Sequence, residues 1–196
     1  MPRREPVRQR RSPTRQPRRT ILIVVGADRT EADYLKGLRD HFKAATVAMR
    51  IVAKPGSPDQ LVQHARDCFD RDQFDEVWCV TDVDHYEREG GKVTAAVALA
   101  AKSGIDLAVS NPCFEIWLLL HRETCASPCV NCDAVLRKLR KSLPAYDKTR
   151  LRFADFAAGL PAAIDRAERL DPAGGDHTRN PSTGVWRLIN VILEQQ

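Results

Sequence analysis

Apolar and amphipathic segments alternate along the first 110 residues of the chain. Residues 21–25 form an unbroken run of Ile, Leu and Val, which is typical of a strand buried on both faces. Residues 77–80 form a second such run, residues 46–53 alternate between apolar and other residues, and residues 105–109 are again mostly apolar. The pattern therefore predicts four strands.

The segments between these strands have helical periodicity. A helix is expected to begin at Thr30, whose hydroxyl can cap it, and another at Ser57-Pro58, because proline is favoured in the first turn. A third helix, rich in alanine, follows Gly90-Gly91. Strands that alternate with helices of this length are joined by crossovers, so the sequence predicts an α/β fold with a parallel four-stranded sheet flanked by helices.

Beyond the fourth strand the pattern becomes helical. A polar loop over residues 171–181 interrupts it, and no internal repeat is present. The length of 196 residues suits one domain, which we place at residues 20–196, with an α/β core at 20–122 and a helical C-terminal extension at 123–196. Helices are expected over residues 112–122, 132–142, 152–170 and 182–194.

Charge is concentrated at the N-terminus. Residues 1–19 contain eight arginines and one glutamate, a net charge of +7, so residues 20–196 carry −2 of the total of +5. Four prolines prevent an amphipathic helix there, and we expect a disordered basic arm. Two interpretations of the arm stay open: a solvated tail, or a segment that contacts the phosphates of DNA or RNA.

Composition also bears on location. No run of about 18 apolar residues is present, and no apolar segment follows the N-terminal arginines, so neither a membrane span nor a secretory signal is expected. Six cysteines, several of them inside apolar runs, are more typical of reduced thiols than of a disulfide framework. We expect a cytoplasmic protein that does not contact the membrane.

Polar residues follow three of the predicted strands, where ligands bind in open α/β sheets. The side chains of Asp82 and Asp84 point to the same face of the sheet if their strand continues to Asp84. Two carboxylates placed together favour binding of Mg²⁺ or Mn²⁺. A simple polar turn at this pair, and a capping role for Asn111 ahead of Pro112, remain open as alternatives. The strand-end residues are Asp28, Glu31, Asp82, Asp84, Ser110, Asn111 and, one turn later, Glu115.

Several strings of residues resemble the RloB-like family. The most specific covers residues 110–121 (SNPCFEIWLLLH), and residues 75–84 (DEVWCVTDVD) form the second. Thr30-Glu31-x-x-Tyr34 and residues 180–183 (NPST) agree as well, so the resemblance runs in order from about Thr20 to the end of the chain.

The resemblance implies a Toprim-like domain and a role in prokaryotic anti-phage abortive infection, with a protein partner from a defence operon as a further possibility. Toprim enzymes cleave phosphodiester bonds with Mg²⁺, held by a glutamate after the first strand and an Asp-x-Asp after the third. The Asp-x-Asp corresponds to Asp82 and Asp84, whereas the glutamate position is occupied by Gly26. Asp28 or Glu31 could replace that glutamate, with Asp28 nearer to the strand end.

These observations lead to two hypotheses. The first is a metal-dependent nuclease acting on DNA or RNA, with Asp82, Asp84, Glu31, Asp28 and Glu115 at its site. The second is a Toprim-like binding or sensor protein that has lost catalysis with the Gly26 replacement; nucleotide binding without cleavage is a third possibility. Further candidates for substrate contact are Asn111, Lys148 and His85, each of which also fits an ordinary capping or surface role.

A second cluster has the chemistry of a zinc site. His121, Cys125, Cys129 and Cys132 lie within twelve positions and offer the ligands of a structural Cys₃His site. Their spacing is not that of a standard zinc knuckle, and His121 belongs to the string that carries the family resemblance. We therefore expect Mg²⁺ or Mn²⁺, and not zinc, as the cofactor.

Overall fold

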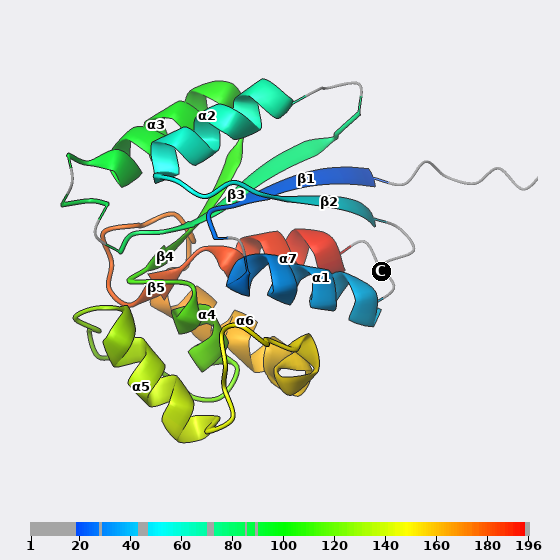
Figure 1. Ribbon diagram of the computed structural model, residues 1–196. Helices are drawn as coiled ribbons and strands as arrows, with labels where there is room; N and C mark the ends of the chain where they lie inside the picture. The colour runs from blue at the N-terminus through cyan, green and yellow to red at the C-terminus, as the bar shows by residue number, and fades with distance from the viewer. Residues whose placement is uncertain are drawn as a thin grey trace, which may run out of the picture.

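The fold is that of a computed structural model, which describes residues 19–27, 29–42, 47–69, 73–84, 86–88 and 90–194. These residues form a sheet with helices packed on both of its faces (Figure 1). The expected basic arm lies outside the described residues apart from Arg19, which begins the first strand.

The sheet has five strands in the order β2-β1-β3-β4-β5. The first four are parallel, as the alternating pattern predicts, and the short β5 runs antiparallel to β4. The prediction of four strands missed β5, because a pairing of two residues with a distant strand has no local periodicity. The strands are β1 Arg19–Val25, β2 Val47–Ala53, β3 Glu76–Asp82, β4 Asp106–Asn111 and β5 Ser182–Thr183.

Seven α-helices and two 3₁₀ turns complete the described part of the chain. The predicted starts at residues 30, 58 and 132 are confirmed, and the alanine-rich helix follows Gly91 as expected. The helices are α1 Thr30–Phe42, α2 Pro58–Cys68, α3 Lys92–Ser103, α4 Glu115–Leu120, α5 Cys132–Ser142, α6 Leu160–Leu170 and α7 Val185–Leu193, and the 3₁₀ turns are η1 Phe153–Asp155 and η2 Ala157–Gly159.

Three predicted helices are shorter than expected. The capping role for Asn111 is wrong, because Asn111 pairs with Ser182 in the sheet and α4 begins only at Glu115. The same pairing delays the last helix until Val185. The expected helix over 152–170 begins as two 3₁₀ turns; at Gly159 the backbone passes so close to the carbonyl of His121 that a Cβ would lie 2.2 Å from its oxygen.

Different helices pack on the two faces of the sheet (Figure 1). Leu22 and Val24 of β1 point into a core under α2 and α3, whereas Ile21, Ile23 and Val25 point into a larger core with α1, α4 and α7. Burial on both faces explains why the sequence of β1 is apolar without alternation. None of the helices within the described residues has both the length and the hydrophobicity of a membrane-spanning segment.

Candidate functional site

Asp82 and Asp84 stand where the central strand ends. Asp82 is the last residue of β3, and Asp84 follows in a turn with a left-handed backbone (φ 36°), which aspartate tolerates better than most residues. The backbone N–H groups of Val83 and Asp84 donate to the carbonyls of Ser110 and Pro112, each at 2.9 Å. The strand therefore does not continue to Asp84 as the spacing suggested, yet the turn still brings both carboxylates to one cavity.

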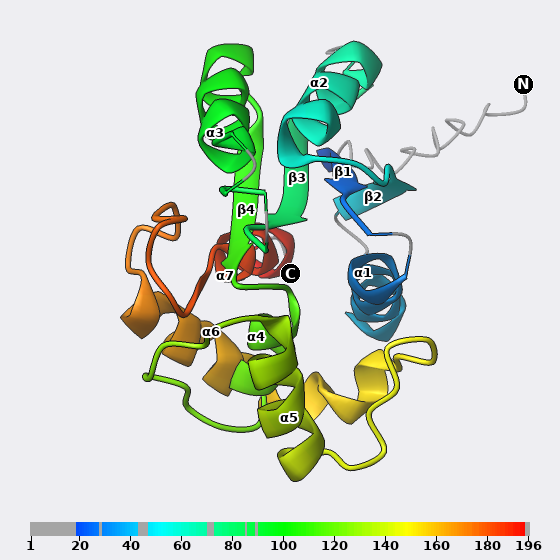
Figure 2. The ribbon, with the colours of Figure 1, turned by 60° about the vertical axis from the view of Figure 1, so that its left-hand side comes forward.

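This cavity has a volume of about 200 Å³ and is lined by four acidic side chains. They are Glu31, Asp82, Asp84 and Glu115. Figure 2 shows the end of β3 above α1 and α4, the two helices that carry Glu31 and Glu115. Glu31 comes from the first turn of α1, and Glu115 is the first residue of α4. An adjoining hollow of about 170 Å³ shares Glu31, Asp82 and Asp84 and includes Gly26 in its lining.

Burial makes the ionised forms of Glu31 and Glu115 costly. It raises the pKa of Glu31 to about 7, with a smaller contribution from the charge of Glu115, and the backbone N–H of Glu31 lowers it. Burial also raises the pKa of Glu115, and the charge of Asp84 raises it further. The Lys148 ammonium has the opposite effect and lowers it. The metal-free site therefore favours protonated carboxyl groups.

Asp82 has the most strongly perturbed environment of the four. Burial holds its pKa well above the ordinary range, and the charges of Glu31, Glu115 and Asp84 raise it further. A hydrogen bond from the Phe114 backbone opposes these effects. Glu31, Asp82 and Glu115 thus all have raised pKa values, and a bound cation would relieve the cost of ionising them.

Two carboxylate oxygens of the site have surroundings that suit a bound cation. Glu31 Oε2 and Asp82 Oδ1 are buried and accept no hydrogen bond from any group in the described part of the chain. A buried carboxylate oxygen without a donor is unfavourable unless something positive meets it. Oxygen-only donors suit Mg²⁺ or Mn²⁺, so Asp82 and Asp84 could hold the ion, with Glu31 and Glu115 in the lining of the same cavity.

Gly26, where the family resemblance led us to expect a glutamate, lines the same hollow as Asp82. A Cβ added there would lie 3.5 Å from both Thr81 Oγ1 and the Val80 carbonyl oxygen, which is ordinary contact. The backbone therefore leaves room for a side chain at this position. Of the two candidate replacements, Glu31 lines the cavity, and Asp28 lies outside the described residues.

The three candidates for substrate contact have different surroundings. Lys148 is exposed and lines the carboxylate cavity. Asn111 does not line it, because its amide donates to the His177 carbonyl at 2.9 Å and ties β4 to the polar loop. His85 lies outside the described residues.

The four candidate zinc ligands are not brought together. Both ring nitrogens of His121 are engaged, Nδ1 with the Phe156 carbonyl at 2.8 Å and Nε2 with the Tyr34 hydroxyl at 3.0 Å. Since a carbonyl only accepts, Nδ1 carries the proton and Nε2 accepts from tyrosine. Burial lowers the pKa of His121 to about 4, which keeps the ring neutral.

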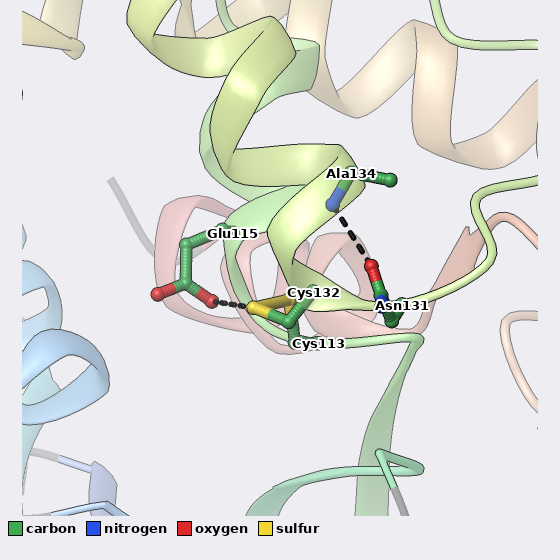
Figure 3. The surroundings of a disulfide bond; sticks show 5 residues. All are labelled: Cys113, Glu115, Asn131, Cys132 and Ala134. Carbon is green, nitrogen blue, oxygen red and sulfur yellow. Dashed lines mark hydrogen bonds between the residues drawn. A yellow bond between two sulfur atoms is a disulfide. The ribbon is translucent and has the colours of Figure 1, made fainter.

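The three sulfurs of the cluster do not lie together: two of them form a pair, and the third is bonded to Cys113, which is outside the cluster. Cys132 forms a disulfide with Cys113, so the expectation of reduced thiols is wrong for this pair (Figure 3). Cys125 and Cys129 are free and lie 3.6 Å apart at their Sγ atoms. Lys138 Nζ is 3.3 Å from Cys125 Sγ and 3.7 Å from Cys129 Sγ.

Sequence reasoning missed Cys113, which lines the carboxylate cavity together with Cys132. Its place two residues before Glu115, in the loop after a predicted strand, was the available signal. Its pairing with Cys132 could not be inferred, because the partner is 19 residues away and belongs to another helix.

Comparison with known proteins identifies the family of the chain. A family model described as "RloB-like protein" matches residues 21–192, which includes every described residue of the carboxylate cavity. No curated protein and no solved structure matches the chain.

Proposed function

Because the chain belongs to the RloB-like family, we propose that it is a divalent-metal-dependent nuclease that cleaves phosphodiester bonds of DNA or RNA. The observation that carries the proposal is the cavity at the end of β3, where four acidic side chains meet and two buried carboxylate oxygens lack a partner among the described residues. The Toprim-like character of the domain and an anti-phage role in abortive infection belong to the same proposal.

Each side chain has a chemical task in this proposal. Asp82 and Asp84 would hold Mg²⁺ or Mn²⁺, and the ion would supply the Lewis acid that such a reaction needs at the scissile phosphate. Glu31 takes the place of the missing strand-end glutamate and transfers the proton, because its carboxyl group lies in the same cavity. Lys148, exposed at the edge of this cavity, attracts the phosphate.

The proposal is tested by metal-dependent cleavage. The full chain is incubated with duplex DNA, single-stranded DNA and tRNA, with Mg²⁺, with Mn²⁺ or with a chelator. We expect at least one substrate to be cleaved with a divalent ion and none with the chelator, because the carboxylate cavity repels phosphate until a cation is bound. Equal cleavage in the presence of the chelator would contradict the metal assignment.

The second candidate function is a binding or sensor protein without catalysis, and the glycine at position 26 favours it. The substitution Gly26→Glu separates the two. If the native chain is inert because it lacks this carboxylate, the variant should gain cleavage by about 10²–10⁴-fold, the usual contribution of a positioned acid or base. If Glu31 already performs this task, the variant gains nothing, and cleavage stays at the native rate or below it.

The basic arm gives an independent prediction about nucleic-acid binding. Removal of residues 1–19 takes away a net charge of +7, so we expect weaker binding and a smaller slope of log affinity against log salt. Fluorescence anisotropy with labelled DNA and RNA at several salt concentrations measures both. An unchanged slope would show that the arm does not contact phosphates.

The proposal also covers the setting of this activity. We propose a cytoplasmic location, where phage nucleic acid is accessible, and a protein partner encoded in the same defence operon. The composition of the chain and the family resemblance support both, and co-purification of a partner from the native host would test the second.

A further inference from the structure

The disulfide between Cys113 and Cys132 is built into the wall of the carboxylate cavity. Cys113 lies in the loop between β4 and α4, and Cys132 is the first residue of α5. Asn131 caps that helix by accepting a hydrogen bond from the backbone N–H of Ala134 at 3.0 Å (Figure 3). The cap fixes the start of α5 and with it the backbone that carries Cys132.

Glu115 turns toward these sulfurs. Its Oε2 lies 3.3 Å from Cys132 Sγ, and the view in Figure 3 shows its carboxylate directed at the disulfide. The two sulfurs and a carboxylate oxygen of Glu115 all lie within 4.8 Å of one another. Two sulfurs and one oxygen at this separation form a donor set different from the oxygen-only set around Asp82.

We propose that, once the disulfide is reduced, Cys113, Cys132 and Glu115 bind a zinc ion. Thiolates select Zn²⁺ over Mg²⁺, and zinc accepts a mixed set of sulfur and carboxylate ligands. In a tetrahedral site with Zn–S bonds of about 2.3 Å the sulfurs lie about 3.8 Å apart, a separation that side-chain rotation can provide at the observed Cα–Cα distance of 5.6 Å.

The fourth position of this site faces open space. All three donors line the cavity of about 200 Å³, so a water molecule or another small ligand can complete the coordination. Three protein ligands with one open position are typical of zinc sites that exchange ligands, in contrast to closed structural sites. The zinc would therefore be accessible from the cavity.

Zinc binding at this site requires two steps, reduction of the disulfide and then loss of the thiol protons. An external dithiol breaks the S–S bond, each protein sulfur gains one electron and one proton, and the dithiol becomes a disulfide. Zinc binding then displaces the two thiol protons into solvent. A covalent link between the β4–α4 loop and α5 is thereby exchanged for a metal link between the same residues.

The other pair of thiols is a poor competitor for the ion. The Sγ atoms of Cys125 and Cys129 are 3.6 Å apart, close to the separation in a zinc site, but the ammonium group of Lys138 lies within 3.7 Å of both sulfurs. A positive charge at that position repels a divalent cation. The structure therefore singles out the Cys113 pair, which has a carboxylate where the Cys125 pair has an ammonium group.

Titration with Co²⁺, followed by displacement with Zn²⁺, tests the site directly. The full chain is reduced with a dithiol, which is then removed without oxygen. We expect a thiolate-to-cobalt charge-transfer band in the near ultraviolet that one equivalent of Zn²⁺ abolishes. The oxidised chain, with the same sequence and the disulfide intact, should give no band.

Variants assign the ligands. Cys113→Ser and Cys132→Ser should lose the band and weaken zinc binding by more than about 100-fold, since even outer-shell changes often cost 10- to 100-fold. Glu115→Gln should weaken it while keeping the band. The double variant Cys125→Ser/Cys129→Ser is the matched control and should behave as the native chain.

Three results would overturn the inference: no band in the reduced native chain, a band that survives in Cys132→Ser, or a band lost only in the Cys125→Ser/Cys129→Ser variant. Because the readout is metal binding, it does not depend on nuclease activity. An inactive protein that binds zinc would leave this inference standing and contradict only the proposed function.

Discussion

Asp82→Asn is expected to lower the rate of metal-dependent cleavage by about 10³-fold. A bound ion supplies several kcal/mol of charge stabilisation in such reactions, and each 1.36 kcal/mol corresponds to about a factor of ten in rate. The substitution keeps the size of the side chain and removes a buried negative charge that Glu31, Glu115 and Asp84 oppose. The metal-free variant should therefore fold at least as well as the native chain, so that lost activity cannot be attributed to unfolding.

Asp59→Asn is the matched control for this experiment. Asp59 also has a buried carboxylate oxygen without a hydrogen-bond partner among the described residues, but it belongs to α2 and lines a different hollow. Cleavage rates measured with saturating Mg²⁺ should be native for Asp59→Asn. Native activity in Asp82→Asn would remove Asp82 from the metal site, and equal losses in both variants would point to a general effect of charge.

The metal-free protein is expected to lose stability as the pH rises through 7 because Glu31 must ionise in a buried site. The pKa of Glu31 is about 7 in the folded protein, against 4.5 as the ordinary value. A raised carboxyl pKa means that the folded state holds the proton more tightly. The contribution of protonated Glu31 is therefore complete below pH 4.5 and is lost above pH 7. The loss amounts to about 3 kcal/mol, because each tenfold difference in proton affinity between the folded and unfolded states is worth about 1.36 kcal/mol.

Urea denaturation between pH 5 and 8.5 measures this effect when the native chain is compared with Glu31→Gln. The comparison is needed because His121 acts in the opposite direction: its pKa is lowered from 6.5 to about 4, so its contribution is lost as the pH falls through that range. The free energy of unfolding of Glu31→Gln relative to the native chain should rise as the pH increases from about 5 to about 7 and then level off. The exposed Glu168→Gln should show no such change.

Mg²⁺ should reverse the loss. Ionised Glu31 adds a negative charge to the cavity that would hold the ion, so Mg²⁺ should stabilise the native chain at pH 8 and stabilise Glu31→Gln less. If the difference between native chain and Glu31→Gln did not vary with pH, the cavity would be better hydrated than the burial of Glu31 indicates. If Mg²⁺ stabilised both chains equally, the charge of Glu31 would not act on the bound ion.

Prediction from the sequence succeeded where the structure depends on residues close together along the chain. The buried runs of β1 and β3 and the start of α5 at Cys132 follow from local periodicity and capping, and the structure has them. Prediction failed at Asn111 and at Ser182, because the pairing of β4 with β5 overrides the local preference for a helix start. It failed again near Gly159, where the close approach to His121 replaces a helical turn.

The candidate site shows the same division. The sequence by itself determined that acidic residues stand at the ends of parallel strands, because strand direction and strand ends follow from the order of apolar and polar segments. Only the tertiary structure decided that Glu31 and Glu115 share a cavity with Asp82, and that Cys113 and not His121 accompanies Cys132. Those choices depend on how α1, α4 and α5 pack together, and packing joins residues whose separation along the chain carries no periodic signal.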